Sequence, residues 1–294
     1  MKSKNVLFVS LLFLILHVNS QTTVKSFKEA QALSLSTNKP IFLITKNFNN
    51  FSKYISTYKY INNPEVRKGL INFVVLELQD QTSDYRYLLF LNKNSYSLGG
   101  NVLDPMGNVI GFFSVKGPSR KTNKTQLDFV IENLIRNSFD LSPLKEEYKA
   151  IIKNNDVHAR INLIEKYLNY SLNTSFFRYK KQKRSPLFSY VAGRYSKELK
   201  KEIKSNNALK ESDQQRLELL DLYKIVIDEK YNRAAKKLQK MSSNSISDSN
   251  KSLFYYLSYV SNLKAKKETV AKEWFDKLKE QKDFDHYFLL SRKI

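Results

Sequence analysis

The chain contains no cysteine among its 294 residues. Disulfide bonds and thiolate metal sites are therefore excluded, whatever compartment the protein occupies. Thiol–disulfide exchange is excluded as well, because it begins with the attack of a thiolate on a disulfide sulfur. Any activity of this protein must use side chains other than thiols.

Histidine is nearly as scarce, and the three histidines are His17, His158 and His286. His158 and His286 are far apart in the sequence and belong to no HxxxH or HxH pattern, so we expect no metal site from them. The chain also lacks a Gly-rich phosphate loop, a Ser–His–Asp spacing and a paired-carboxylate motif. We therefore expect no cofactor, no metal and no catalytic residue. An enzyme of unrecognised non-thiol chemistry in the second half of the chain is the alternative.

Long hydrophobic runs are missing except at the amino terminus. There, two lysines precede the apolar run Val6–Val18, and Val18-Asn19-Ser20 provides the small residues that a signal peptidase reads. The run is shorter than the roughly 20 residues that a membrane-spanning helix needs. The sequence therefore predicts a secretory signal peptide over residues 1–20, cleaved after Ser20, and a periplasmic or secreted protein. An uncleaved anchor is the alternative.

Positive charge and aromatic residues, by contrast, are abundant. Lysine and arginine number 50 against 28 acidic residues, and the formal net charge is +22. Because 41% of the residues are hydrophobic and 13% are aromatic, the composition is that of a folded chain and not of a charged disordered one. The length suits two domains better than one.

Residues 21–140 alternate between helical and strand-like patterns. The predicted order is helix, strand, helix, short helix, strand, a stretch without a clear pattern over residues 80–100, hairpin and helix. The corresponding segments are 26–33, 41–44, 48–60, 63–66, 73–78, 102–113 and 125–137. A helical crossover between two buried strands indicates a parallel pair, and the turn Asp104–Asn108 indicates a hairpin. We therefore predict an α/β sandwich with one mixed sheet.

Residues 141–294 lose the strand-like runs and show helical patterns with lysine-rich outer faces. The segment Ser242–Asn250, rich in Ser and Asn, is predicted as a linker. Ala234 and Ala271 lie 37 residues apart, in segments that resemble the second helix of a tetratricopeptide repeat, whose usual length is 34. We predict an all-helical domain of helical hairpins. Its expected helices are Leu144–Asn154, Val157–Tyr170, Leu187–Ser205, Asp213–Asp228, Tyr231–Met241, Lys251–Lys266 and Lys267–Gln281.

Four short motifs occur in order in the first half of the chain. They are Lys39-Pro40 before an apolar strand, Asn63-Pro64-Glu65-Val66, the strand Asn72–Asp80, and Asp104-Pro105-Met106-Gly107. This ordered set resembles the secreted thioredoxin-like proteins of bacterial envelopes over residues 26–137. The resemblance implies a thioredoxin-like three-layer sandwich with a mixed central sheet over residues 21–140, followed by the all-α helical-hairpin domain over residues 141–294.

The resemblance also locates the position of the family's CxxC motif. Counting forward from the Lys-Pro motif and back from the Asn-Pro motif places it at Asn50, Phe51, Ser52 and Lys53, none of which is cysteine. Ser52 lacks the acidity of a thiol and has no histidine nearby in the sequence. The family's cis-proline falls at Leu98. The resemblance thus implies a degenerate, non-catalytic site that retains a groove facing a peptide.

The densest basic cluster is in the helical half. Arg178, Lys180, Lys181, Lys183 and Arg184 lie beside aromatic residues in the sequence. Such a cluster is a candidate site for a polyanion. In an exported protein, an acidic polysaccharide, an anionic membrane surface or an acidic protein fits it better than nucleic acid does. A solvated lysine-rich surface without a ligand is the alternative.

The sequence therefore predicts an exported, non-catalytic thioredoxin-like protein. We expect it to act as a binding, scaffolding or chaperone-like module in the cell envelope, with a protein or peptide as its partner. Polyanion binding through the basic helical half is the first alternative, and the enzyme of non-thiol chemistry is the second.

Overall fold

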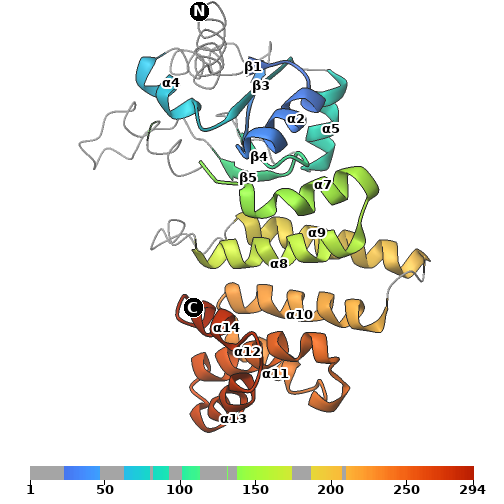
Figure 1. Cartoon of the computed structure of the whole chain (residues 1–294), viewed down its shortest axis with the longest axis vertical. Coiled ribbons are helices and arrows are strands. Elements are labelled where there is room, and N and C mark those ends of the chain that lie inside the picture. Colours follow the sequence, from blue (N-terminus) through green and yellow to red (C-terminus); the bar gives the residue numbers. More distant parts are fainter. Residues whose placement is uncertain are drawn as a thin grey trace, which may run out of the picture. The chain divides into compact units, whose positions relative to one another are not determined.

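A computed structural model of the chain shows two compact units, Met1–Lys145 and Glu146–Ile294. The structure describes residues 23–46, 63–79, 82–92, 101–112, 131, 138–173, 187–206 and 210–294. The first unit contains a sheet with helices, and the second is built from helices (Figure 1). The predicted arrangement of an α/β part followed by a helical part is therefore confirmed.

One mixed sheet forms the centre of the first unit. Its five strands are β1 (Thr23–Val24), β2 (Ile41–Lys46), β3 (Val74–Gln79), β4 (Asn101–Leu103) and β5 (Val109–Phe112). Their spatial order is β1-β3-β2-β4-β5. β3 runs parallel to β1 and β2, whereas β4 runs antiparallel to β2 and to β5. The predicted parallel pair, the hairpin and the mixed sheet are all present, and β1 is a strand that the sequence did not predict.

Three helices of the first unit begin at residues that cap them. They are α2 (Phe27–Thr37), α4 (Pro64–Leu70) and α5 (Ser83–Leu91). The side chains of Ser26, Asn63 and Thr82 each accept a hydrogen bond from a backbone N–H in the first turn, which satisfies a donor that the helix leaves free. α5 lies within residues 80–100, where the sequence showed no clear pattern. The predicted helices over residues 48–60 and 125–137 lie outside the described residues, apart from helical Ile131.

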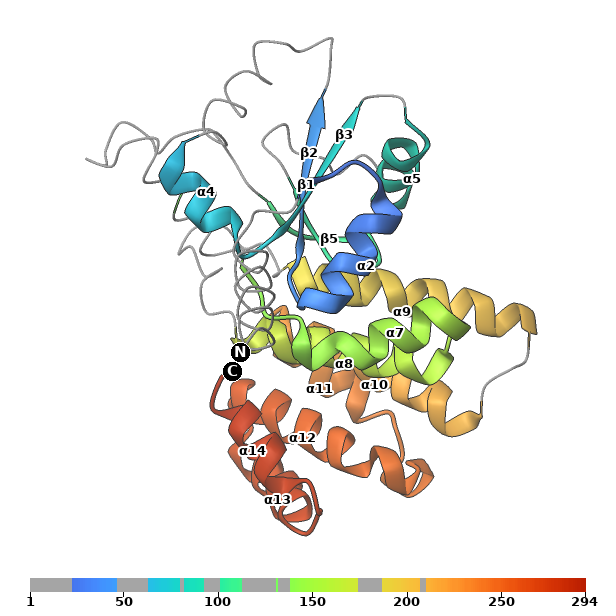
Figure 2. The same cartoon turned by 45° about the horizontal axis from the view of Figure 1, so that its top comes forward.

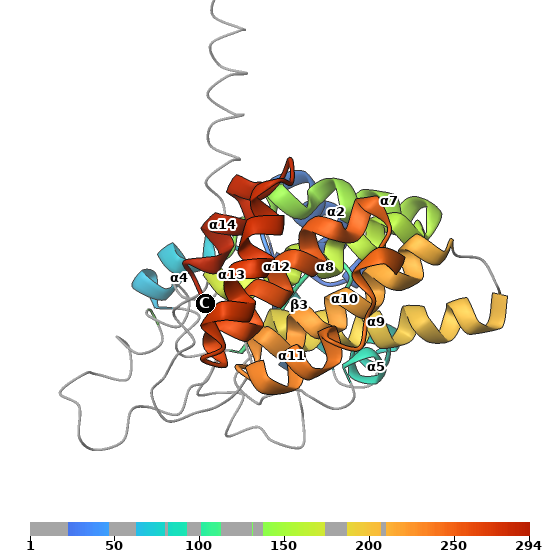
Figure 3. The ribbon, with the colours of Figure 1, turned by 90° about the horizontal axis from the view of Figure 1, so that it is seen from below.

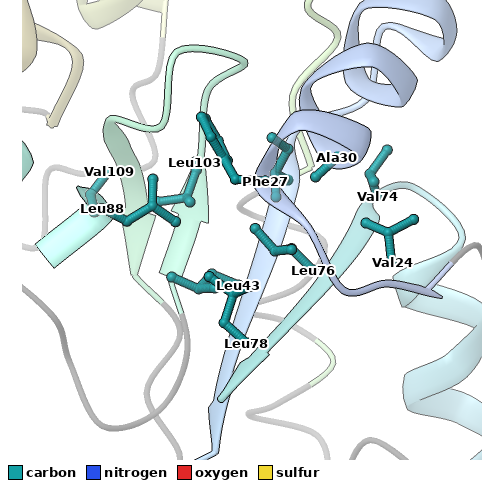
Figure 4. Close-up of a cluster of buried hydrophobic side chains, with 11 residues drawn as sticks. Val24, Phe27, Ala30, Leu43, Val74, Leu76, Leu78, Leu88, Leu103 and Val109 are labelled. Atoms are coloured by element: carbon teal, nitrogen blue, oxygen red, sulfur yellow. The ribbon is translucent and has the colours of Figure 1, made fainter. Parts of the chain in front are cut away.

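Both faces of the sheet are apolar. Successive side chains along a strand point to opposite sides, so a run of consecutive apolar residues supplies apolar side chains to both faces. Leu43 and Leu76 belong to one buried cluster with Ala30 of α2 and Leu88 of α5 (Figure 4). Phe42 and Val75, next to them in the strands, are also buried, and the Phe42 ring meets that of Phe73 with 5.8 Å between centroids. α4 lies on the side of the sheet opposite α2 and α5 (Figure 2). Two buried faces explain why β2 and β3 are continuous apolar runs.

The β4–β5 turn is built around the buried carboxylate of Asp104. Its Oδ1 accepts hydrogen bonds from the backbone N–H groups of Met106 and Asn108, each at 2.8 Å. The turn then passes through Gly107, whose φ of +83° is a conformation that favours glycine. The sequence motif Asp-Pro-Met-Gly-Asn therefore forms the predicted turn through one side chain and one backbone conformation.

Asn92 joins this turn to the end of α5. Its buried amide group donates to the carbonyl oxygens of Leu88 and Gly107 at 2.9 and 2.8 Å. Its Oδ1 accepts a hydrogen bond from Val109 N at 2.9 Å. The helix α5, which the sequence did not predict, is thus held against the predicted hairpin by one side chain.

The second unit contains helices and no strand among its described residues. Its helices are α7 (Lys145–Asn154), α8 (Val157–Asn173), α9 (Leu187–Asn206), α10 (Glu211–Ile227), α11 (Tyr231–Leu238), α12 (Asp248–Lys264), α13 (Glu268–Lys279) and α14 (Phe284–Ser291). The seven predicted helices correspond to α7–α13, and α14 was not predicted. No helix in the described part of the chain is long and apolar enough to cross a membrane.

The predicted linker Ser242–Asn250 is wrong at its carboxyl end. Residues 248–250 form the first turn of α12, and Asn250 is buried. Its amide nitrogen donates to Ser212 O at 2.8 Å and to Ser247 Oγ at 2.9 Å. Asparagine, which favours loops in the sequence, serves here to hold the first turn of α12 against α10.

Two successive hairpins of this unit repeat the same design. α10 begins at Glu211 and α12 at Asp248, 37 residues later, and both helices have 17 residues. α11 begins at Tyr231 and α13 at Glu268, again 37 residues later. α12 packs against α10, α11 and α13 (Figures 1 and 3). The 37-residue spacing of the two alanines is therefore the spacing of a structural repeat, and both alanines are buried.

The turns within the two hairpins have the same backbone geometry. Glu229 and Lys266 occupy equivalent positions with φ of 60° and 61°. The next residue in each turn donates its N–H to a carbonyl five residues back: Lys230 to Ile225 O at 3.1 Å, and Lys267 to Asn262 O at 2.9 Å. Such bonds satisfy carbonyl groups left free at the helix end. The two turns therefore differ in side chains and not in backbone.

Candidate functional site

The site residues inferred from the thioredoxin resemblance and the densest basic cluster lie outside the described residues. This applies to Asn50, Phe51, Ser52 and Lys53, to Leu98, and to Arg178, Lys180, Lys181, Lys183 and Arg184. The nearest described residue before the degenerate motif is Lys46, the last residue of β2, four positions before Asn50 in the sequence. The site residues and the groove implied by the resemblance remain predictions.

The two histidines of the helical unit are not brought together. His158 Nδ1 lies 3.6 Å from Asp213 Oδ1, and its side chain is exposed. His286 is exposed at the surface of α14, with its ring against that of Tyr287. Within the part of the chain that the structure describes, no three His, Asp or Glu side chains are grouped as a metal ion would require.

A buried polar cluster does occur in the helical unit, between α8, α10 and α14. Arg216 Nη2 donates to both carboxylate oxygens of Glu165, at 2.7 and 2.6 Å. The two side chains are only 19% and 16% exposed. Tyr287 of α14 lies close enough to the same guanidinium group to interact with it electrostatically. Hydrogen bonds between an arginine and a carboxylate are stronger than neutral ones, so this contact fixes α8 against α10.

A second row of polar groups extends the cluster to α12. The Tyr223 hydroxyl on α10 donates to Asn169 Oδ1 on α8 at 2.8 Å. The ring of Tyr256 on α12 stands edge-on to Tyr223, with 5.7 Å between centroids. It also contacts the ring of Tyr287, at 5.1 Å. Aromatic and polar contacts therefore join all four helices through one set of side chains.

Burial controls the protonation of this cluster. It raises the pKa of Tyr223, Tyr256 and Tyr287 well above that of a free tyrosine, and nearby Tyr256 and Glu165 add to the effect at Tyr223. Burial also acts to lower the pKa of Arg216, but Glu165 and Tyr287 outweigh it, so the pKa lies above its ordinary value. The tyrosines therefore remain neutral and the arginine charged. A tyrosine with a raised pKa is a poor base or nucleophile near neutral pH, and the contacts of these side chains join the helices.

Replacing Arg216 by Met should destabilise the helical unit by about 2–3 kcal/mol, because it leaves the Glu165 carboxylate largely buried without its partner. The figure is below that for a fully buried pair because both side chains keep some contact with water. Chemical denaturation of the full chain measures this change. Arg233→Met is the matched control, since Arg233 is exposed on α11 and makes no ion pair among the described residues. Equal stability of the two variants would contradict a stabilising role for the pair.

The sequence offered only one signal for this cluster. Glu165 and Asn169 are four residues apart and so share a face of the predicted helix. Their partners come from α10, and Arg216 and Tyr223 are seven residues apart there. Nothing in the sequence indicates which faces of separate helices will meet, because that depends on how the hairpins pack.

A second candidate site is an exposed basic surface at the turn between α12 and α13. Residues 263–272, which we call the lysine tip, contain Lys264, Lys266, Lys267 and Lys272, and all four side chains are exposed. None of them makes an ion pair with another described residue. Glu268 is the single acidic residue in the segment. The lysine tip therefore presents free positive charge on the helical unit.

The lysine tip also exposes apolar side chains. Leu263, in the last turn of α12, is 40% exposed, and Val270, in the first turn of α13, is 39% exposed.

No protein-family model, curated protein or solved structure matches this chain. What the two units bind must therefore be argued from the residues themselves. From the sequence alone, the exposed apolar neighbours of the lysines in the lysine tip cannot be distinguished from core residues, because that distinction depends on how the helices pack.

Proposed function

We propose that this chain is an exported, non-catalytic binding protein of the cell envelope. In this proposal its α/β unit has the thioredoxin-like fold without the reactive cysteines, and its helical unit provides a second surface for a partner. A protein or peptide is the partner that the proposal favours, in a binding, scaffolding or chaperone-like role. The observation that carries the proposal is the sheet of the first unit, taken together with the absence of cysteine from the whole chain.

The arrangement of β2 supports the position of the degenerate site. β2 lies inside the sheet, parallel to β3 and antiparallel to β4. In open α/β sheets, ligands bind beyond the carboxyl ends of the parallel strands. Asn50 follows the carboxyl end of β2 by four residues in the sequence. A motif placed there suits the contact of a peptide with the sheet edge, and without sulfur it supports binding and not exchange.

Restoring the two cysteines tests the proposal directly. If the scaffold is that of a thioredoxin, Asn50→Cys together with Lys53→Cys should create a dithiol that reduces insulin, while the natural chain should not. The physical reason is that the first thiol would lie at a helix amino terminus, where the partial positive charge lowers a thiol pKa. The reaction rate of the thiols with an alkylating reagent, measured against pH, reports that lowered pKa.

The control variant carries two cysteines with the same spacing at the carboxyl end of a helix. Lys236→Cys with Gln239→Cys places two thiols three residues apart at the carboxyl end of α11, where both residues are exposed. There the helix dipole opposes ionisation, so this variant should not reduce insulin. If the Asn50 and Lys53 variant behaved like this control, the thioredoxin-like scaffold would be wrong.

Polyanion binding through the helical unit is the second candidate function. The observation that favours it is the set of exposed lysines without ion pairs in the lysine tip, on a chain of net charge +22. Such a surface attracts anionic ligands, and the attraction weakens as salt screens it. Binding to immobilised heparin that is lost at high salt tests this function, and full retention of binding at high salt would contradict it.

A further inference from the structure

The two repeated hairpins differ most in the charge of their turns. The turn between α10 and α11 carries Asp228, Glu229 and Lys230, and Asp228 forms ion pairs with Lys224 and Lys230 at 2.8 and 3.8 Å. The equivalent turn between α12 and α13 carries Ala265, Lys266 and Lys267. Because the backbone geometry is the same, the fold of the hairpin does not require the lysines. Their charge is a feature that local structure leaves unexplained.

We propose that the lysine tip binds an anionic membrane surface. Lys264, Lys266 and Lys267 supply the electrostatic attraction to lipid headgroups, and Leu263 and Val270 insert their side chains among them. This proposal rests on the second candidate function above, and it adds the ligand class and the residues.

Exposed apolar side chains beside the lysines favour lipid over a polysaccharide. Leu263 and Val270 are each about two-fifths exposed, next to lysines that are free of acidic partners. A polysaccharide chain offers these side chains no apolar environment, whereas the boundary between headgroups and acyl chains does. Each lysine near an anionic membrane surface contributes on the order of a fivefold increase in affinity. Three lysines together therefore raise the affinity for an anionic membrane roughly 100-fold, and the two apolar side chains add to this.

The test is co-sedimentation of the full chain with vesicles, using phosphatidylcholine alone or mixed with phosphatidylglycerol. The natural chain should bind the mixed vesicles, and high salt should release it. Replacing Lys264, Lys266 and Lys267 together by Glu should weaken binding at least 100-fold, by the fivefold contribution of each lysine. Glu at position 266 is compatible with the fold, because Glu229 occupies the equivalent position at the same φ.

A matched control has the same change in net charge elsewhere on the unit. Replacing Lys236, Lys237 and Lys240 by Glu alters three exposed lysines at the end of α11 that leads into α12. α12 has 17 residues, so at 1.5 Å per residue that end is separated from the lysine tip by about 25 Å. This control should keep vesicle binding within about fivefold of the natural chain.

The apolar contribution is tested by replacing Leu263 and Val270 together by Ser. Vesicle binding should fall at least tenfold, because two partly exposed side chains lose their burial in lipid. Binding to heparin should stay the same, since the lysines remain. Equal loss of vesicle and heparin binding in this variant would contradict insertion into lipid.

The possible failures can be told apart. If the natural chain and the variant of Lys264, Lys266 and Lys267 bind mixed vesicles equally well, the lysine tip is not the membrane-binding surface. Polyanion binding by another surface of the chain would then remain. If the natural chain binds heparin and not vesicles, the ligand class is wrong. If it binds neither, the second candidate function fails as well. Should the triple variant not fold, Lys266→Glu alone must still lower vesicle affinity at least fivefold.

Discussion

Replacing Gly107 by Ala should cost about 3 kcal/mol of stability, measured as the free energy of unfolding of the α/β unit. Gly107 has φ of +83°, which strains any residue with a Cβ atom. A Cβ there would also lie 2.6 Å from Leu88 Cδ2 and 3.0 Å from Phe27 Cζ. Backbone strain and overpacking each contribute roughly 1–3 kcal/mol, and here both act on one atom.

Gly193→Ala is the matched control for this substitution. A Cβ on Gly193 of α9 would meet Lys224 Cε at 2.9 Å, which is the far end of a flexible side chain that can move away. Alanine is also the better helix former by about 1 kcal/mol. The same chemical change should therefore be neutral or stabilising in the helical unit.

Urea unfolding of the full chain, followed with probes for each unit, separates the two effects. Loss of stability confined to the α/β unit in Gly107→Ala would support the packing of α5 and α2 against the hairpin turn. Similar stability of Gly107→Ala and the natural chain would mean that the turn does not contact Leu88 and Phe27 as described.

Local sequence patterns predicted most of the helices and strands, because the formation of these elements depends largely on residues close together in the sequence. The apolar runs became β2 and β3, and the turn motif joined β4 to β5. Helix α5 was not predicted because its apolar residues are concentrated in the run Leu88–Leu91 and do not recur over several turns at helical spacing. The residues that hold it are distant: Asn92 reaches the turn, and Asp84 accepts from Phe27 N at 2.6 Å.

The helical unit shows a different limit of sequence reasoning. The predicted helix 267–281 corresponds to α13 (Glu268–Lys279), but α14, which follows at Phe284, was not predicted. α14 has aromatic residues on more than one face, which pack on Phe275 and on Tyr256. Tertiary contacts of this kind stabilise a short helix that would be marginal alone. The polar cluster of Glu165 and Arg216 was missed for the same reason, since its members come from separate helices.

The 37-residue repeat of the helical unit was only partly visible in the sequence. A 37-residue spacing between two alanines was visible in the sequence, but it differs from the 34 residues of the tetratricopeptide repeat and lacks that repeat's other signals. In the structure it relates helices of equal length and turns of equal geometry. Equal backbones with different side chains allow one turn to carry two acidic residues and one lysine, and the other two lysines and no acid. The sequence alone did not show that these two turns are equivalent, because the equivalence rests on the matching backbone conformations of Glu229 and Lys266.

The stability of the helical unit should fall steeply above about pH 10. Burial raises the pKa of Tyr223, Tyr256 and Tyr287 from the ordinary value of 10.0. Above pH 10 the unfolded chain loses these protons while the folded chain keeps them, so ionisation favours unfolding. Their contribution is fully present below pH 10 and is lost as pH rises toward the folded pKa values. Each tyrosine contributes about 1.4 kcal/mol to this loss for each pH unit, and the three together contribute about 4 kcal/mol for each pH unit.

Tyrosine-to-phenylalanine variants identify the groups responsible. Tyr256→Phe removes one of the three protons, so the slope of unfolding free energy against pH should fall by about 1 kcal/mol per pH unit between roughly pH 10 and pH 11. Tyr190→Phe is the control, because the Tyr190 side chain is 53% exposed and lies outside the cluster. Its slope should match that of the natural chain. If Tyr256→Phe left the slope unchanged as well, the tyrosines would not be buried together between α10, α12 and α14, and the cluster described around Arg216 would lose its basis.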